Sequence, residues 1–555
     1  MPNHDKQPQA GSRIRTYVPG GASIPRFAAA FTLAVLISGC TKLGPDFLRP
    51  ETDVQKEWME AETSEFKPVE PTDDGRWWTV FGDPVLDRLV QVSYQQNLTL
   101  KSAGVRILEA RAQLGIAVGS LYPQQQQATG DVRYNKTSKN IANTAGGDLS
   151  FWNYDVGLTA GWEIDFWGRF ARGIESADAG LLASVANYDD VLVSLTSQVA
   201  TTYVAVRTFE ERIAIAEANI KIQQRGLQIS DVRFRNGATT ELDVLQAETL
   251  LRETQASVPG FESGRRQAMN ALATLLGITP VEAYSLMYGP TEGPGVIPIA
   301  PPEVAVGIPA DLLRRRPDVR LAELDAWTQS ALIGVAKADL YPSIALVGTI
   351  GLSAGDGTST SRNGSVGLGD LVDSDSLRFQ GGPAVTWNVF NYGRIKNNVR
   401  VQDARLQQLL VGYQNTVLRA GQEVEDAMVG FLQSQLQAGF LEKGVKAAKR
   451  SVDVALVQYR DGATDYTTVL DTQRSLVTQQ DQFTTTRGAI AQNLVAMYRA
   501  LGGGWQIRKG QEFVSEETQA VMRERTDWGG LLDPNAVENI PAPDEASETR
   551  RSPDW

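Results

Sequence analysis

The sequence FRNGATTELDVLQ, residues Phe234–Gln246, occurs a second time as YRDGATDYTTVLD, residues Tyr459–Asp471. Gly237 and Gly462 occupy the same place in the two copies, 225 positions apart, and each follows a long segment with heptad-spaced apolar residues. Glycine at such a place commonly ends a helix, and the threonine or aspartate that follows is a candidate N-cap for the next one. The two copies therefore predict the tips of two long helical hairpins, near residues 237 and 462.

Other motifs recur at nearly the same separation, which indicates that more than the tips is duplicated. The matching pairs are Leu121-Tyr122-Pro123 with Leu340-Tyr341-Pro342, Trp167-Gly168-Arg169 with Tyr392-Gly393-Arg394, and Leu276-Gly277 with Leu501-Gly502. We therefore predict two internal repeats of one architecture, at residues 77–278 and 311–504.

Residues 156–166 alternate strictly between apolar side chains at even positions and small or polar ones at odd positions, as in a strand with two unlike faces. Residues 128–134 alternate too, and in the second half Ile344–Leu352 and Val385–Val389 each place apolar residues on one face. These patterns predict one β-hairpin with a long polar loop in each half. We place the hairpins at about 124–166 and 343–391.

Strands of about ten residues joined by polar loops are typical of transmembrane β-barrels, although a soluble β-sandwich shows the same alternation. Four strands cannot close a barrel, and an open sheet edge cannot face lipid. If these strands lie in a membrane, the barrel must be shared between chains.

The helical segments are unusually long. No proline lies between Pro123 and Pro259, so the usual helix breaker is missing there. A single helix over residues 168–236 would reach roughly 100 Å at 1.5 Å per residue. At the first tip, Thr240 and Asp243 have the spacing of a capping box. Apolar residues at seven-residue intervals predict a coiled-coil seam: Ile213, Ile220, Leu227 and Phe234.

The N-terminus has the features of a bacterial lipoprotein signal. Arginines precede the short apolar run Phe27–Ile37, which is too short to span a membrane. Cys40 follows small residues and is the only cysteine in the chain. We expect residues 1–39 to be a signal peptide, Cys40 to be acylated, and residues 40–76 to form a lipid-anchored extended segment. Thr41 at the next position favours export to the outer membrane.

Composition argues against several classes of function. The net charge of -12 leaves no basic face for nucleic acid. The only histidine is His4, inside the expected signal peptide, so we expect no histidine-based catalytic triad and no histidine or cysteine metal cluster in the mature chain. We expect a protein that is not an enzyme and that holds no cofactor and no metal.

Two segments lie outside the predicted repeats. Residues 279–310 are rich in proline and glycine and are expected to form a linker in a belt around the middle of the molecule. Residues 505–555 are expected to add to this belt, with a short helix near Glu516–Arg525 and then an acidic, disordered tail.

Several motifs resemble those of outer-membrane efflux factors of the TolC/OprM type, especially the lipoprotein branch. They are Cys40 with Gly44-Pro45-Asp46-Phe47, then Leu312–Arg320, Ile333–Ala338, Trp387–Arg394 and Leu501–Trp505. The resemblance implies a mixed α+β membrane protein that forms a homotrimer. In it, three chains with four strands each close a 12-stranded transmembrane β-barrel, and their helices form a long α-helical coiled-coil barrel through the periplasm.

The resemblance also implies a gate at the periplasmic entrance, carried by the second tip. The gate residues carried over by position are Asp471 and Arg474, with Tyr466 and Thr467 one turn earlier. A ring of carboxylates selects for cations and can be tied shut by neighbouring arginines. The alternative for Asp471 is a surface carboxylate that pairs with Arg474 on the same helix. Residues expected to contact an adaptor or to close the tip turns are Arg235, Gly237, Val244, Leu245 and Gly462.

The implied function is that of a passive exit duct through the periplasm and outer membrane, for drugs or other small toxic compounds. Its implied partners are a periplasmic adaptor protein, an inner-membrane pump of the RND type and outer-membrane lipid. Two alternatives remain: the duct of a type I protein secretion system, and a non-conducting coiled-coil scaffold anchored by lipid. The paired alternating strands favour a channel, because a scaffold needs no membrane hairpins.

Overall fold

A computed structural model describes residues 42–50, 57–60, 66–68, 74–141, 148–289, 295–301, 304–306, 315–359 and 364–532. The expected signal peptide, Cys40 and the expected disordered tail beyond residue 532 lie outside the described residues. No helix within the described ranges is both long and apolar enough to cross a membrane.

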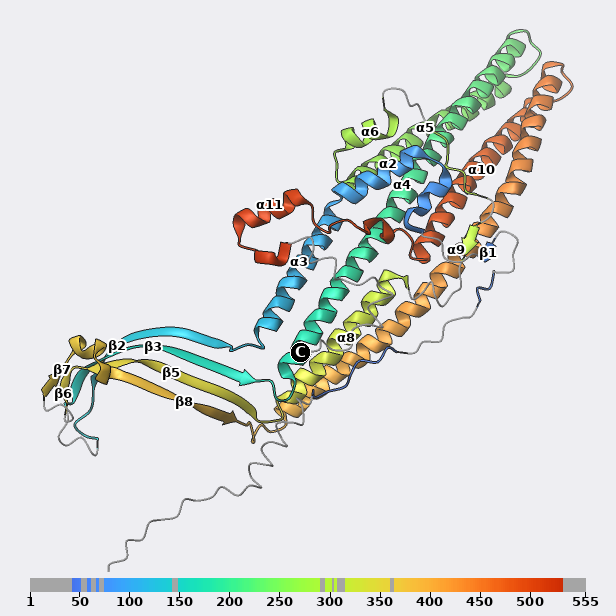
Figure 1. Cartoon of the computed structure of the whole chain (residues 1–555). Helices are drawn as coiled ribbons and strands as arrows, with labels where there is room; N and C mark the ends of the chain where they lie inside the picture. The colour runs from blue at the N-terminus through green and yellow to red at the C-terminus, as the bar shows by residue number, and fades with distance from the viewer. Residues whose placement is uncertain are drawn as a thin grey trace, which may run out of the picture.

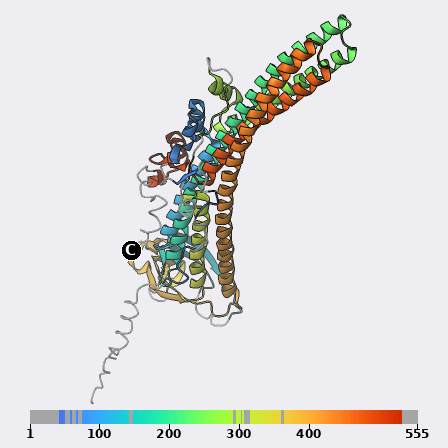
Figure 2. The same cartoon turned by 90° about the vertical axis from the view of Figure 1, so that its right-hand side faces the viewer.

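Two helices of equal length run through most of the molecule (Figure 1). Helix α4 spans Arg169–Arg235 and helix α9 spans Arg394–Arg460, with 67 residues each, which confirms the prediction of one helix over 168–236. Each turns back at a tip into a second helix, α5 (Glu241–Leu276) or α10 (Tyr466–Ala500). Figure 2 shows that these helices curve away from the body as they approach the tips.

Two shorter helices complete the bundle at the end away from the tips. Helix α3 (Leu98–Gly119) packs against α4, and α8 (Pro317–Ala338) packs against both α4 and α9. Pro317 occupies the first turn of α8, where its missing N–H would have no partner in any helix.

Four strands form one antiparallel sheet in the order β2-β3-β5-β8 (Figure 1). Their bounds are Gln125–Lys136, Ser150–Ile164, Ser343–Gly355 and Leu377–Thr386. The prediction that Trp387 and Val389 belong to the last strand was wrong, because β8 ends at Thr386. Within one chain β8 is an edge strand with a partner on one side only, so nothing extends its ladder.

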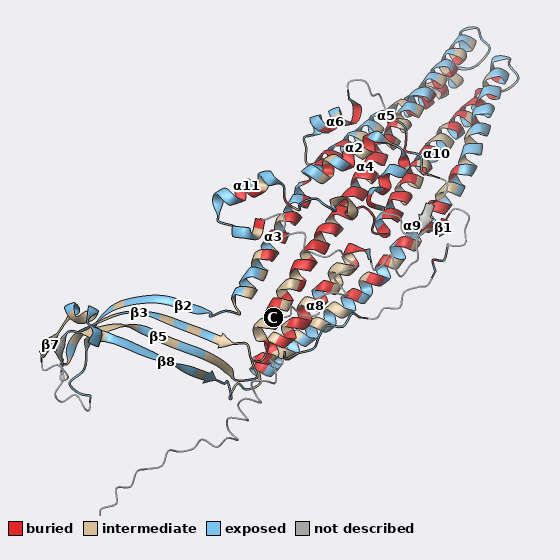
Figure 3. Ribbon diagram, in the orientation of Figure 1, coloured by how far each residue is buried: buried red, intermediate tan, exposed pale blue. Residues whose placement is uncertain are grey.

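The four strands carry exposed and partly exposed residues and none that is buried (Figure 3). Leu158 is 60% exposed, Ile350 48% and Phe379 75%. Exposed apolar surface this extensive marks a membrane or protein contact. The main core lies elsewhere, in the middle of the helical body, where Trp77 stacks on Tyr498 with 5.4 Å between ring centroids.

Short elements form a belt around this core. The first repeat opens with the 3-10 helix η1 (Asp74–Phe81), and Pro84 then opens the next helix. The other belt elements are α2 (Pro84–Gln96), α6 (Pro280–Tyr288), α11 (Glu516–Arg525), η4 (Trp505–Arg508), η5 (Gly529–Leu532), and β1 (Phe66–Pro68) paired with β4 (Val304–Val306). The loop between β5 and β8 holds β6 (Gly357–Ser359), β7 (Gly364–Val366), η2 (Leu368–Val372) and η3 (Ser374–Ser376).

Candidate gate and anchor sites

Both hairpin tips use the same backbone turn. Gly237 and Gly462 have φ values of 71° and 76°, which non-glycine residues rarely adopt. The amide of Ala238 donates to the carbonyl of Arg233 at 2.8 Å, and that of Ala463 donates to the carbonyl of Gln458 at the same distance. These bonds satisfy carbonyls that the last helical turn leaves open.

The capping box predicted at the first tip does not form. Thr240 is the N-cap of α5, but its side chain makes no capping bond. Asp243 instead accepts hydrogen bonds from the hydroxyls of Thr239 and Tyr459, the latter at 3.1 Å. Because Tyr459 belongs to α9, the carboxylate that was expected to cap its own helix ties the first tip to the second.

A guanidinium completes this connection between the tips. Arg233 donates to the backbone carbonyl of Tyr459, and its charge lies 4.5 Å from the centroid of the same ring. A cation over an aromatic ring gains about 0.5–1 kcal/mol at an exposed site. Arg233, Asp243 and Tyr459, which we term the tip latch, therefore hold the two hairpins of one chain together.

The tip latch sits on a small apolar cluster formed by both hairpins. Tyr459 packs edge-on against Tyr466, with 5.2 Å between the ring centroids. Burial raises the pKa of both phenols, so they remain neutral hydrogen-bonding groups. The other fully buried members are Ala247, Leu250, Ala455, Val469 and Leu470.

The structure separates the four predicted gate residues. Thr467, Asp471 and Arg474 are exposed on α10. Tyr466 is only 1% exposed, because its ring fills the apolar cluster between the hairpins. It supports α10 from within one chain. Arg474 lies 3.8 Å from the carboxylate of Glu253 on α5, and not on Asp471 as the helix-surface alternative expected.

The residues expected at the adaptor-facing tip lie on its surface. Arg235 is exposed and pairs with Asp231 on its own helix at 2.8 Å. Leu245 is 52% exposed and Val244 is partly exposed. These side chains are accessible for contact with another protein.

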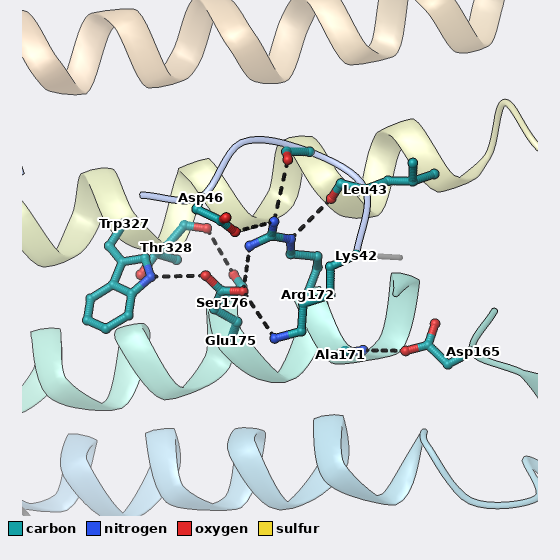
Figure 4. A network of polar contacts seen from close by, with 11 residues as sticks. Lys42, Leu43, Asp46, Asp165, Ala171, Arg172, Glu175, Ser176, Trp327 and Thr328 are labelled. Atoms are coloured by element: carbon teal, nitrogen blue, oxygen red, sulfur yellow. Dashed lines mark hydrogen bonds and ion pairs between the residues drawn. The ribbon is translucent and has the colours of Figure 1, made fainter. Parts of the chain in front are cut away.

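A second polar site fixes the chain just after Cys40 (Figure 4). The side chain of Arg172, near the start of α4, is only 2% exposed. Its guanidinium donates to the carbonyl of Leu43 at 3.1 Å, to Asp46 at 2.7 Å and to Glu175 at 2.8 Å. Glu175 in turn accepts from the indole N–H of Trp327 on α8. We call this set the anchor clamp, since it holds the segment that follows Cys40 against the helices.

Two glycines make room for the anchor clamp. Gly44 has a φ of 100°, and a Cβ built on it would lie 2.6 Å from the Cα of Gly334. A Cβ on Gly334 would lie 2.5 Å from the carbonyl oxygen of Leu43 and 2.7 Å from Cγ of Arg172. These distances are too short for a Cβ atom at either position. The N-terminal segment can therefore lie against α8 only because residues 44 and 334 are both glycine.

A third charged site lies among the helices of the body, around a cavity of about 180 Å³. Arg316 donates to Asp318 at 2.9 Å and to Glu423 at 2.8 Å, which joins α8 to α9. Asp190 on α4 and Arg499 on α10 line the same cavity. Burial, reinforced by the negative charge of Asp318, raises the pKa of Asp190 to about 6.

Sequence patterns found the tips but missed the tip latch and the anchor clamp. Arg233 and Arg172 lie outside the duplicated motifs, and nothing in their spacing distinguishes them from surface arginines. Gly44 and Gly334 belonged to motifs already noticed in the sequence. A glycine inside a helix can mark a close backbone approach, which was the available signal for the anchor clamp.

Comparison with known proteins identifies the family. The family model "Outer membrane efflux protein" matches residues 89–278 and 308–503. The pyoverdine export outer membrane protein OpmQ of Pseudomonas putida is 31% identical over 78% of this chain and 89% of its own length. The cation efflux system protein CusC of Escherichia coli is 26% identical over 86% of this chain and 98% of its own length.

A solved structure agrees with the sequence relatives. The outer-membrane channel OprN superposes with a TM-score of 0.77 at 29% identity and covers 84% of this chain and 100% of its own. The match therefore extends over the helices, the sheet and the belt. On this evidence the chain belongs to the family of outer membrane efflux proteins.

Proposed function

We propose that this protein is the exit duct of a tripartite efflux pump, a passive homotrimeric channel through the outer membrane and the periplasm. The observation that carries the proposal is the joining of two unlike parts in one chain. A sheet with an exposed apolar face continues into helices of 67 residues, each roughly 100 Å long. Such a length suits an object that crosses a compartment.

The sheet supports an assembly of several copies. Its outer strands β2 and β8 each have one partner only, and an open edge in lipid leaves backbone groups without hydrogen bonds. We propose two duplicated halves per chain and three chains per barrel, so that 12 strands close the sheet. The lipid on Cys40, held in place by the anchor clamp, would keep each copy beside the membrane.

The gate in this proposal lies on α10. Asp471 and Arg474 are exposed within one chain, so both side chains are free to face the axis of a trimer. A ring of three carboxylates attracts cations and can be bridged by arginines of neighbouring copies. The tip latch would hold α9 and α10 in the closed position until an adaptor contacts the tips.

Positive groups near the tips support docking by a periplasmic adaptor. A polar groove on α4 and α9 is lined by Lys221, Arg225 and Arg460. Together with the exposed Leu245, this surface offers charge and apolar contact to a helical partner. The energy for transport would come from an inner-membrane pump, because a passive duct performs no chemistry.

Relatives of this duct are named for unlike substrates. Their names refer to substrates as unlike as pyoverdine and a cation. We propose that this chain exports small toxic compounds chosen by its pump.

Retention of small molecules in living cells tests the proposed function. In the bacterium that encodes the chain, removal of the gene should raise the accumulation of fluorescent pump substrates several-fold. A plasmid copy should restore efflux. Unchanged accumulation across a broad panel of such compounds, with normal expression of the chain, would contradict an efflux role.

Sensitivity to vancomycin, which is too large to cross the intact outer membrane, tests the gate. Asp471→Ala and Arg474→Ala should sensitise cells several-fold, because loss of the ring contacts opens the duct. Asp403→Ala removes an exposed carboxylate on α9 and serves as the control. Equal resistance in all three variants, at equal protein levels, would remove the gate assignment.

A further inference from the structure

One contact between the two halves of the chain is made by a residue of the first half, and the corresponding residue of the second half is exposed. Trp167, just after β3, packs on Tyr341 with 4.6 Å between ring centroids, and its indole N–H donates to the carbonyl of Pro342 at 2.8 Å. The first half thus packs on the second where the strands pass into the helices. Tyr392 holds the position of Trp167 in the second half, yet its side chain is 102% exposed.

The surface that Tyr392 would need is also exposed. Tyr122 and Pro123 correspond to Tyr341 and Pro342. Tyr122 is 57% exposed and Pro123 is exposed as well. One chain therefore exposes the ring of Tyr392 on one side of the junction. On the opposite side it exposes Tyr122 and Pro123, which correspond to the surface that Trp167 contacts.

We propose that Tyr392 of one copy packs on Tyr122 and Pro123 of the next copy, and that β8 pairs with the next copy's β2 in the register that β3 makes with β5. This inference rests on the proposed trimer and names the contacts that close it. It continues an interface that is already formed inside each chain.

The two halves match closely at the junction, so the contact between halves can serve as the template for the contact between copies. The indole N–H of Trp162 donates to the carbonyl of Leu121 at 3.0 Å. In the second half, Trp387 donates to Leu340, also at 3.0 Å. Each half therefore makes the same bond between a tryptophan near the end of its second strand and the turn that precedes its first strand.

The hairpins also match residue by residue. Gln125 lies opposite Gly161 at the start of the first hairpin, and Ser343 lies opposite Thr386 at the start of the second. Residues of β3 thus correspond to residues of β8 that lie 225 positions later, as Trp162 does to Trp387. Residues of β2 correspond to residues of β5 that lie 218 positions later, because the second half has one residue fewer between its proline and its strand.

These correspondences define the register between copies. Ala160 lies opposite Gly348 within one chain, and their counterparts are Val385 and Gly130. Val385 should therefore face Gly130 of the next copy. In this register the exposed apolar side of β8 continues onto the apolar side of β2, whereas a shift by one residue would place it on the polar side.

The backbone of Tyr392 agrees with a contact outside the chain. Its φ of 50° is the only positive value at a non-glycine residue in the described part of the structure. A bulky residue rarely holds such a conformation unless its surroundings require it. Packing between copies would provide that requirement.

Cysteine cross-linking tests the register. Cα atoms directly opposite each other on antiparallel strands lie about 4.5–5.5 Å apart, within the range for a disulfide. The double variant Val385→Cys with Gly130→Cys should give a three-chain ladder on a non-reducing gel after mild oxidation. Val385→Cys paired with Asp131→Cys or with Val132→Cys probes slips of one and two residues and should cross-link weakly. The parent chain, with Cys40 alone, is the background.

The tyrosine is tested by Tyr392→Gly, which relieves the positive-φ strain. If Tyr392 acted only within its own chain, this variant would form a trimer at least as stable as the parent. We expect instead that the trimer dissociates at a lower temperature in detergent, while Tyr392→Phe stays close to the parent.

Strong cross-linking at Val132 or Asp131 rather than at Gly130, or none at any of the three, would overturn the proposed register. An unchanged Tyr392→Gly trimer would overturn the tyrosine contact. If either result were obtained while the protein still conducted ions, the proposed duct function would be retained. If correctly cross-linked trimers neither conducted ions nor restored efflux, the proposed duct function would be rejected, and the proposed contacts between copies would be retained.

Discussion

At the scale of single residues, Gly334 shows how the anchor clamp depends on an absent side chain. Gly115 holds the matching place on α3, and a Cβ there would meet no atom of the chain within 4 Å. Alanine in a helix is favoured over glycine by roughly 0.5–1 kcal/mol. Gly115→Ala should therefore be neutral or stabilising. Gly334→Ala should lower the melting temperature, because the new methyl displaces Leu43 or Arg172.

Thermal unfolding followed by circular dichroism compares the two alanine variants. Limited proteolysis adds a local readout, since a displaced segment should be cut sooner between residues 42 and 50. Equal melting temperatures and equal cleavage in both variants would show that the anchor clamp is not needed to hold this segment.

Asp190 predicts a pH dependence whose sign follows from its raised pKa of about 6. In the unfolded chain an aspartate titrates near 3.9, so ionisation of Asp190 opposes folding. The penalty is absent below about pH 4 and complete above about pH 6. Asp190→Asn should therefore stabilise the protein at pH 7.5, by on the order of 1–3 kcal/mol. The gain should vanish near pH 4.

Melting curves at several pH values, in one detergent, measure this difference. Asp403→Asn, an exposed carboxylate on α9, controls for the general effect of removing a charge. No gain at pH 7.5 would show that the surrounding arginines fully compensate the charge of Asp190. A gain that is the same at every pH would show that it does not arise from the ionisation of Asp190.

At the scale of elements, the tip latch should control how firmly α9 and α10 are held. Arg233→Met removes the bond to the Tyr459 carbonyl and the charge above its ring. We expect amides of residues 459–470 to exchange their hydrogens at least several-fold faster in this variant. Arg235→Met lies two residues away and loses only an exposed pair with Asp231, so it should exchange like the parent.

Hydrogen–deuterium exchange followed by mass spectrometry resolves this segment. Faster exchange in both variants would indicate general fraying of the tip. Unchanged exchange in Arg233→Met would mean that the apolar cluster alone holds the hairpins together.

Much of the element level could be predicted because it follows from periodic patterns. Heptads without proline predicted α4, and period-two alternation predicted β3. The end of β8 could not be predicted, because the pattern through Trp387 and Val389 continues while the ladder ends for lack of a neighbour. The contact between Asp243 and Tyr459 joins residues far apart in the chain, and local spacing favoured the capping box instead. Tyr466 was placed at the gate by position, from the family resemblance, and the position alone did not show that its ring is buried within one chain.

At the scale of the whole molecule, each end of the bundle has its own task in the proposed function. The sheet presents apolar surface where a membrane would contact it, and the tips present charged and apolar surface where partners would dock. Between them Arg316, with Asp318 and Glu423, joins α8 to α9 in the body. A motion at the tips can therefore remain local while the body stays rigid.

The central claim is that three copies form a gated conduit for ions and small solutes. Single-channel conductance of the purified trimer in a planar bilayer tests it most directly. We predict small cation-selective openings for the parent, and larger, longer openings when Asp471→Ala or Arg233→Met loosens the tips. No conductance from a verified trimer, in the parent or in either variant, would contradict the account.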